Sequence, residues 1–259
     1  MNDAFAHHDP VATAKLALAC LDLTSLNDAD TPADIDTLCA RALGLDPARG
    51  PTGAVCVWPR FVAQARGLLP PSIAVAAVAN FPDGSADTAR AVADTRAIVE
   101  AGGDEVDVVF PYRDFGAAPG LLNAVRRACL GRKLKVILET GEIKDLPLIA
   151  RASRIALDAG ADFLKTSTGK TPVSATPEAA RVLLEAIAAD PLTRHRVGFK
   201  PSGGIRTVAD AALYIGLTRE MLGDAALTPA RFRIGASGLL NDIEAVLSGA
   251  ASPDLATTY

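Results

Sequence analysis

The sequence predicts an α/β protein, a single-domain (β/α)8 TIM barrel with an extra helix before the first strand. Short apolar runs alternate with longer amphipathic segments from position 21 to position 237. Each apolar run ends in polar or glycine residues, and no long linker divides the 259 residues. A doubly wound open sheet is the alternative, but no GxGxxG motif follows the first run.

Eight apolar runs have the length and composition of buried strands. They are LDLT (21–24), AVCVW (54–58), IAVAAVANF (73–81), EVDVVF (105–110), LKVILET (134–140), DFLKTS (162–167), VGFKPSG (197–203) and FRIGAS (232–237). In a barrel the active site lies at the carboxyl-terminal ends of the strands. Polar residues in the last half of each run are therefore the candidates for function.

The segments between the runs carry helix signals, with Pro early and Gly late. Helices are predicted to start at Thr31, Ser85, Asp145, Thr176 and Thr207, and the extra first helix covers about 11–20. The stretch GLDPARGPTG (44–53) is short enough for an ordinary loop. We therefore predict one domain over 1–259, with flexible tails at 1–10 and 250–259.

Composition excludes several classes of partner. A net charge of −4 supplies no broad basic face for nucleic acid, so we expect only a local anion site. The four cysteines lack the spacing of zinc sites or of a disulfide framework, which predicts a cytoplasmic protein without a metal. The longest apolar run, 73–79, is far shorter than the roughly 20 residues of a membrane span, and the N-terminus does not resemble a signal peptide.

Three charged side chains are predicted to point into the barrel. In EVDVVF the alternate apolar residues share one face, which leaves Asp107 on the inner face. The same alternation pairs Lys165 with Phe163 and Lys200 with Gly198. Taken singly, such lysines and aspartates are more often surface groups or ion-pair partners. Two lysines and an aspartate on one barrel rim instead favour catalysis.

A lysine in this setting suits carbonyl chemistry. Burial and a second cation both disfavour an ammonium ion, so we expect Lys165 and Lys200 to lower each other's pKa and give a nucleophilic neutral amine. The three histidines, His7, His8 and His195, lie away from the predicted strand ends. Proton transfer is therefore expected to fall to Asp107, a lysine or water.

Glycine-rich loops follow the seventh and eighth runs. Barrel enzymes often bind phosphate there, through backbone N–H groups and a helix N-terminus. The candidates are Gly203, Gly204, Gly235, Ser237 and Gly238. TGK at 168–170 resembles the end of a P-loop, but position 164 is Leu instead of the required glycine, so ATP binding is rejected. Thr168, Gly169 and Lys170 stay as candidate substrate contacts.

Eight blocks of the sequence resemble the deoxyribose-phosphate aldolase family, in order and over nearly the whole chain. They are DLTSLN, CVWPRF, ANFPDG, DEVDVVFPY, KVILETGEI, DFLKTSTGK, GFKPSGGIR and FRIGAS. The resemblance implies that Lys165 forms a Schiff base, that Lys200 perturbs it and shares in proton transfer, and that Asp107 relays protons. It also implies reversible cleavage of 2-deoxy-D-ribose 5-phosphate to acetaldehyde and D-glyceraldehyde 3-phosphate, without a cofactor or metal.

Further expectations follow from the resemblance. Asp22 in the DLT block would contact a substrate hydroxyl, or else only cap a strand end. Tyr259 ends the chain as in some members, where it is thought to reach the site, although it could equally belong to a tail. Gly238 replaces a serine that the family often has, so weaker phosphate binding is expected. The resemblance also implies dimerisation.

Two alternatives to this activity stay open. One is another Schiff-base aldolase that acts on a different sugar phosphate with the same lysine and glycine loops. The other is a non-catalytic sugar-phosphate-binding barrel, which would need neither Lys165 nor Asp107. The presence of all three charged groups favours an enzyme.

Overall fold

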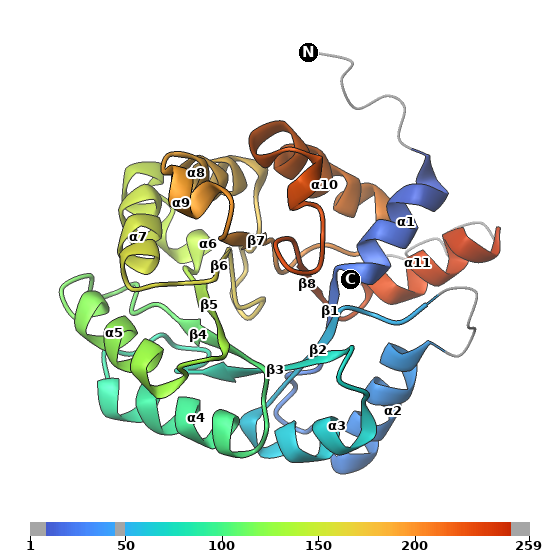
Figure 1. The fold of residues 1–259 in the computed structure, drawn as a ribbon, viewed down its shortest axis with the longest axis horizontal. Coiled ribbons are helices and arrows are strands. Elements are labelled where there is room, and N and C mark those ends of the chain that lie inside the picture. Colours follow the sequence, from blue (N-terminus) through green and yellow to red (C-terminus); the bar gives the residue numbers. More distant parts are fainter. Residues whose placement is uncertain (1–8, 45–49, 250–259) are drawn as a thin grey trace.

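The computed structural model describes residues 9–44 and 50–249, and these form the predicted α/β barrel (Figure 1). Within these ranges, eight parallel strands pair in the order β7-β6-β5-β4-β3-β2-β1-β8. They are β1 (Leu21–Thr24), β2 (Ala54–Val57), β3 (Ala74–Ala79), β4 (Glu105–Val109), β5 (Lys133–Ile137), β6 (Phe163–Lys165), β7 (Gly198–Lys200) and β8 (Ile234–Ala236). Each lies within or one residue beyond a predicted run, so the fold prediction is confirmed.

The ring closes between β7 and β8. Two isolated parallel bridges join Phe199 to Phe232 and Ser202 to Gly235. The backbone N–H of Arg233 donates to the carbonyl of Phe199 at 3.1 Å, and that of Gly235 donates to the carbonyl of Pro201 at 2.9 Å. A closed sheet leaves no unpaired edge, and every strand directs alternate side chains into the ring.

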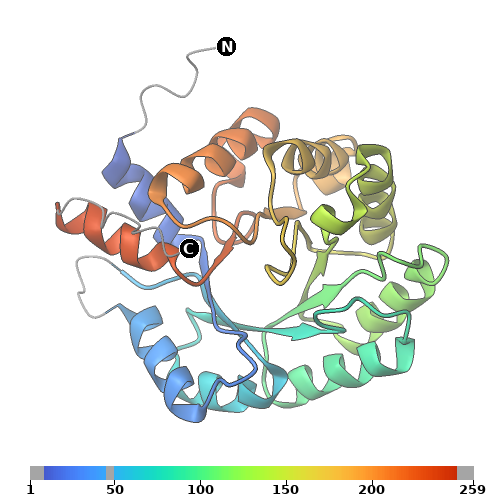
Figure 2. The ribbon, with the colours of Figure 1, turned by 180° about the vertical axis from the view of Figure 1, so that it is seen from behind.

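Helices surround the strands on the outside, as both faces of the molecule show (Figures 1 and 2). The helices and 3₁₀ turns are α1 (Pro10–Ala19), α2 (Pro32–Leu43), η1 (Pro59–Phe61), α3 (Val62–Leu68), α4 (Thr88–Glu100), α5 (Ala118–Ala128), α6 (Thr140–Ile143), α7 (Leu146–Asp158), α8 (Pro177–Ala188), α9 (Pro191–Arg194), α10 (Val208–Leu222), η2 (Asp224–Ala226) and α11 (Leu239–Ser248). None of these helices combines the length and apolar content needed to cross a bilayer.

Side-chain caps set where most of the predicted helices begin. Four predicted starts are confirmed as N-caps whose side chains accept a backbone N–H, namely Thr31, Asp145, Thr176 and Thr207. The helix predicted from Ser85 begins at Thr88, because Asp87 supplies the cap instead.

The extra first helix is α1, and its start corrects the predicted N-terminal tail. Asp9 caps the helix, with its carboxylate accepting the N–H of Val11 at 2.9 Å, and Pro10 is the first helical residue. The structure therefore places residues 9 and 10 at the start of α1, whereas the sequence prediction included them in a tail. The remaining predicted tail positions, 1–8 and 250–259, lie outside the described residues. Treatment of all of 1–259 as one domain stays a prediction.

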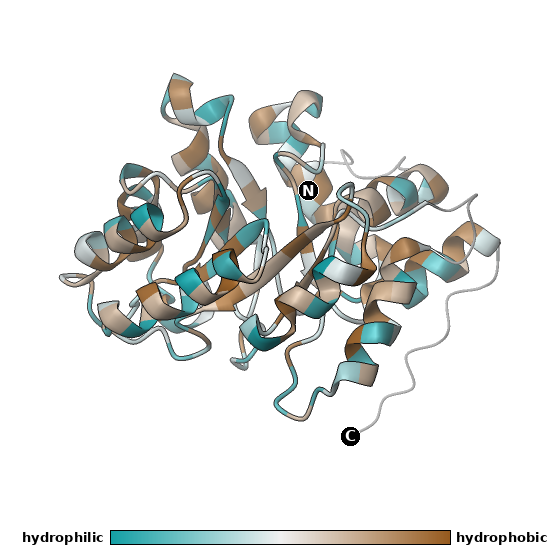
Figure 3. Cartoon of the chain, turned by 60° about the horizontal axis from the view of Figure 1, so that its bottom comes forward, coloured by the Kyte–Doolittle hydropathy of each residue, from teal (hydrophilic) through white to brown (hydrophobic). Residues whose placement is uncertain are grey.

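Two apolar clusters stabilise the barrel. The larger lies between the strands and the helices, whose outer faces are more hydrophilic (Figure 3). The smaller cluster includes inward side chains of β2 to β5 and consists of Leu26, Cys56, Ala76, Val78, Phe81, Val109 and Ile137. It fills only part of the interior, and buried charged residues occupy much of the rest.

Gly198 on β7 leaves space for the Phe163 ring inside the barrel. A Cβ at this position would lie 2.6 Å from Cδ1 of Phe163 and 2.7 Å from the carbonyl oxygen of Arg231. Overpacking of this kind typically costs about 1–3 kcal/mol. We therefore expect Gly198→Ala to lower the free energy of unfolding by that amount in urea titrations. Gly67→Ala is the control, because a Cβ there has no neighbour within 4 Å, and equal stability of the two variants would contradict the packing argument.

Candidate active site

Seven charged residues lie inside the barrel, and we call them the charge cluster. Each has an exposed fraction of 4% or less. Its members are Asp22 on β1, Glu105 and Asp107 on β4, Lys135 on β5, Lys165 on β6, Lys200 on β7 and Arg233 just before β8. Barrel interiors are usually filled by layers of branched apolar side chains, so a buried cluster of charges indicates a function.

Asp107 is the centre of the cluster. Its Oδ1 accepts a hydrogen bond from Nζ of Lys135 at 2.7 Å. Its Oδ2 accepts two more, from Nζ of Lys165 at 2.9 Å and Nζ of Lys200 at 2.8 Å. The structure thus brings together the three side chains that the alternation of β4, β6 and β7 placed inside the barrel.

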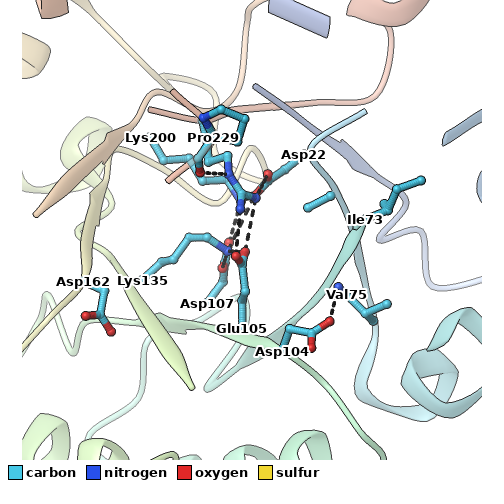
Figure 4. Close-up of polar contacts among 12 residues, drawn as sticks. Asp22, Ile73, Val75, Asp104, Glu105, Asp107, Lys135, Asp162, Lys200 and Pro229 are labelled. Atoms are coloured by element: carbon cyan, nitrogen blue, oxygen red, sulfur yellow. Dashed lines mark hydrogen bonds and ion pairs between the residues drawn. The ribbon is translucent and has the colours of Figure 1, made fainter. Parts of the chain in front are cut away.

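Three members of the cluster were missed in the sequence. Arg233 donates to Oε1 of Glu105 at 2.8 Å. Nζ of Lys135 lies 2.5 Å from Oε2 of Glu105 (Figure 4). The signal was present, because Glu105 shares the inner face of β4 with Asp107, and Lys135 occupies the matching position of β5. Of these three residues, Lys135 contacts Asp107 directly, and Glu105 connects Lys135 with Arg233.

Asp22 joins Lys200 to Arg233 within the charge cluster. Its Oδ2 lies 2.5 Å from Nζ of Lys200, and its Oδ1 accepts from Arg233 at 2.6 Å. The side chain is fully buried and is not part of the cavity lining described below. Contact of Asp22 with a substrate hydroxyl stays a prediction. The observed partners of Asp22 are Lys200, Arg233 and Lys135.

The pKa values of the two site lysines shift in opposite directions. Burial lowers the pKa of Lys165, and the nearby Lys200 ammonium lowers it further, against the opposing effect of Asp107. Burial also disfavours the charged form of Lys200, but the carboxylates of Asp107 and Asp22 outweigh it and raise the pKa. Lys200 thus lowers the pKa of Lys165 as expected, whereas the net pKa of Lys200 is raised, because Lys200 has a second carboxylate partner.

Charge balance explains why Lys165 is the site lysine whose pKa is lowered. The cluster holds four cationic groups and three carboxylates, so one cation is in excess when all are ionised. An unbalanced charge in a buried site is unfavourable. Among the described residues, Lys135 lies within 4 Å of three carboxylates and Lys200 within 4 Å of two, whereas the one carboxylate that Lys165 contacts is Asp107. Neutral Lys165 leaves three cations facing three carboxylates.

A cavity of about 640 Å³ opens beside Lys165. Its lining includes Lys165 and every described residue that the sequence predicted to bind substrate or phosphate, namely Thr168, Gly169, Lys170, Gly203, Gly204, Gly235, Ser237 and Gly238. Asp107 and Lys200 are not part of the lining. Lys165 is thus the member of the charge cluster that a ligand in the cavity can reach. Tyr259 lies outside the described residues.

The glycine loops form one wall of this cavity. Gly203 and Gly204 have φ angles of 84° and 79°, a conformation that favours glycine. A Cβ on Gly235 would lie 2.6 Å from Oγ of Ser202 and 3.1 Å from Cε of Lys200, so glycine permits close packing against the site lysine. Gly238 is the N-cap of α11 and leaves the helix N-terminus without a side-chain cap. Such a terminus suits a small anion.

Lys170 lies in the loop after β6 and lines the cavity. Its Nζ donates to the carbonyl oxygen of Leu26 in the loop after β1 at 2.7 Å. This contact links two loops at the carboxyl-terminal ends of their strands. Within the described residues, no group of three or more His, Cys, Asp or Glu side chains is arranged to hold a metal ion.

Fold and site define the class of protein as an α/β barrel with a buried amine that faces a ligand cavity. Residues 16–243 match the model of the DeoC/LacD family of aldolases, and the chain belongs to this family. The resemblance found in the sequence is confirmed. The deoxyribose-phosphate aldolase of Agrobacterium fabrum (strain C58) is 48% identical over 258 residues, which cover 96% of this chain and 97% of the relative.

Solved structures agree on the fold. A Toxoplasma gondii ME49 protein described as a deoxyribose-phosphate aldolase superimposes with a TM-score of 0.83 at 24% identity, covering 93% of this chain and 96% of its own. The deoxyribose phosphate aldolase of Aeropyrum pernix, described as tetrameric, gives a TM-score of 0.69 at 25% identity over 96% of this chain and 98% of its own. At such identity the Toxoplasma match supports the architecture alone.

Proposed function

We propose that this chain is a Schiff-base aldolase that reversibly cleaves 2-deoxy-D-ribose 5-phosphate into acetaldehyde and D-glyceraldehyde 3-phosphate. The observation that carries the proposal is the position of Lys165. Its amine has a lowered pKa and lines the cavity, at whose wall the glycine loops and the N-terminus of α11 lie. Membership of the aldolase family and the 48% identical relative support the same activity.

The neutral amine of Lys165 would add to the aldehyde carbon of the substrate, and loss of water would give an iminium ion. The iminium restores a fourth positive charge to a cluster with three carboxylates. Cleavage of the bond between carbons 2 and 3 delivers an electron pair to the iminium nitrogen and gives a neutral enamine. Because bond cleavage removes this excess positive charge, the cluster favours formation of the enamine from the iminium ion.

Proton transfer would fall to Asp107 and Lys200. Asp107 has a pKa far below its usual value, because the three lysines around it outweigh its burial, so it is an ionised acceptor. Lys200 has a raised pKa and is a charged donor. Oδ2 of Asp107 accepts hydrogen bonds from the amines of both Lys200 and Lys165, so Asp107 and Lys200 lie next to the reacting amine. Through a water, this pair would accept the proton of the hydroxyl on carbon 3 and later protonate the enamine carbon.

The phosphate would bind at the glycine loops. Backbone N–H groups around Gly203, Gly204 and Gly238 and the N-terminus of α11 supply donors without a broad basic surface. Gly238 offers no hydroxyl group, so we propose weaker discrimination between phosphorylated and free sugars than a serine there would give. Among the partners, a sugar phosphate is the expected substrate, whereas dimerisation and a cytoplasmic location stay predictions.

Borohydride trapping tests the proposed function. Incubation with acetaldehyde and sodium borohydride should reduce the imine to a stable ethyl adduct, which peptide mass analysis should locate on Lys165. The buried Lys135, whose pKa is raised by its carboxylate neighbours, serves as an internal control that should stay unmodified. Absence of an adduct would refute imine chemistry and favour a non-catalytic barrel.

A panel of substrates separates the proposed activity from that of another Schiff-base aldolase. Cleavage of 2-deoxy-D-ribose 5-phosphate should be faster than cleavage of keto sugar phosphates. The reverse order would assign the chain a different donor and leave the Lys165 chemistry intact.

A further inference from the structure

Glu139 lies between β5 and α6 in a strained backbone conformation. Its φ and ψ angles are 56° and 58°, and its side chain is fully buried. Among the described residues other than glycine, positive φ occurs only at Asn80, Glu139 and Lys144. Such strain persists only where the surrounding structure imposes it, and it is frequent at functional sites. Glu139 takes no part in the proposed reaction steps.

The Glu139 carboxylate holds the loop that follows Lys165. Its Oε2 accepts the hydroxyl of Thr168 at 2.5 Å and the backbone N–H of Thr168 at 3.3 Å. Its Oε1 accepts the hydroxyl of Thr171 at 3.2 Å. One buried carboxylate thus receives three donors from a segment of four residues, and Thr168 lines the cavity.

Backbone contacts on both sides of Glu139 support the same loop. The N–H of Leu138 donates to the carbonyl of Lys165 at 2.9 Å, and the N–H of Thr140 donates to the carbonyl of Thr166 at 3.0 Å. Gly141 in α6 also packs against this loop, since a Cβ on Gly141 would collide with the carbonyl oxygen of Val173. The loop between β6 and α8 is therefore packed directly against α6.

The opposite side of this loop faces the predicted phosphate wall. A Cβ on Gly203 would lie 3.2 Å from Cα of Gly169 and 2.5 Å from Oγ of Ser174. The loop is thus enclosed between α6 and the glycine loop after β7. A change in how Glu139 holds the loop would move Thr168 and Gly169 and disturb Gly203 as well.

We propose that Glu139 is a positioning residue that acts through Thr168 and Thr171 to fix the cavity wall, so that it determines the affinity for the sugar phosphate. This inference rests on the proposed function. The amine of Lys165 is held by Asp107 rather than by Glu139, so imine formation with a small aldehyde does not depend on this wall. Burial raises the pKa of Glu139 against the hydrogen bonds from Thr168, as expected for a carboxylate enclosed between two elements.

Glu139→Ala and Glu139→Gln test the proposal. Loss of hydrogen bonds to a buried carboxylate weakens an interaction by roughly 10- to 100-fold. We expect Glu139→Ala to raise KM for 2-deoxy-D-ribose 5-phosphate by that factor, with kcat changed about threefold at most. Glu139→Gln keeps an amide oxygen that can accept from Thr168, so it should recover part of the affinity. The rate of acetaldehyde trapping on Lys165 should match that of the unmodified protein in both variants.

Asn80→Ala is the matched control. Asn80 is equally buried, also has a positive φ, and its side chain donates to the carbonyls of Ser85 and Val109 at 2.8 and 3.1 Å. Its loss should lower the Tm and leave KM unchanged. Unchanged KM in both Glu139 variants, or an equal rise in Asn80→Ala, would overturn the proposal. Failure of trapping in the unmodified protein would instead refute the proposed function.

Discussion

Lys165→Met is expected to abolish aldol cleavage, lowering kcat by about 10⁴-fold or more, since no other amine of the charge cluster reaches the cavity. Methionine fills a similar volume and removes the nucleophile. Steady-state assays of 2-deoxy-D-ribose 5-phosphate cleavage measure the loss. Residual activity within tenfold of the unmodified protein would contradict the assignment of Lys165.

Stability separates this loss from unfolding. Lys165→Met leaves three cations facing three carboxylates, and Asp107 keeps its contacts with Lys135 and Lys200. We therefore expect an unchanged or higher Tm. The same substitution one strand away is the control, because Lys135 lies within 4 Å of three carboxylates. Breaking such a buried arrangement costs about 3–5 kcal/mol, so Lys135→Met should be strongly destabilised.

The fold was predictable because its signals are local and repeated. Each strand is a short apolar run, and each predicted helix outside the tails has a cap residue at or near its start. Alternation along β4, β6 and β7 placed Asp107, Lys165 and Lys200 inside the barrel before any contact was known. Closure of the sheet then brings residues 58 and 93 positions from Asp107 within hydrogen-bonding distance of it.

Glu105, Lys135 and Arg233 were not predicted, because only polar residues in the last half of each strand were taken as candidates. Glu105 begins β4, and Arg233 precedes β8. The role of Lys135 becomes apparent only when β5 is aligned with β4, where Asp107 pairs with Lys135 across the sheet. Applied to every strand, the same alternation would have found these residues.

Other features depend on contacts that no local pattern encodes. The raised pKa of Lys200 requires Asp22, a residue 178 positions away, next to its amine. The loop contacts of Glu139 likewise join positions 29 and 32 residues apart through side-chain oxygens. Only the assembled barrel determines which lysine has a lowered pKa and which loop the Glu139 carboxylate holds.

Lys200→Leu should move the pH dependence of activity towards alkaline values. The Lys200 ammonium lowers the pKa of Lys165, so its removal raises that pKa and leaves Lys165 as a main counter-ion of Asp107. A larger fraction of Lys165 is then protonated at neutral pH, and a protonated amine cannot attack an aldehyde. Because a proton donor is lost as well, kcat/KM at pH 7 should fall by about 10²-fold or more. The fall should be smaller at pH 9 to 10, where more of the amine is neutral.

The pH profile of borohydride trapping separates the two effects of this substitution. Trapping needs the neutral amine of Lys165 but no cleavage of the substrate, so its pH dependence reports the pKa of Lys165 alone. Lys133→Leu is the control. Lys133 is the first residue of β5, at the end of the strand away from the cavity, and its Nζ lies 5.8 Å from the centre of the Phe163 ring. An unshifted trapping profile in Lys200→Leu would refute the inference that the Lys200 ammonium lowers the pKa of Lys165. If the trapping profile shifts but kcat/KM is normal at high pH, Lys200 does not take part in proton transfer. Its role would then be limited to lowering the pKa of Lys165.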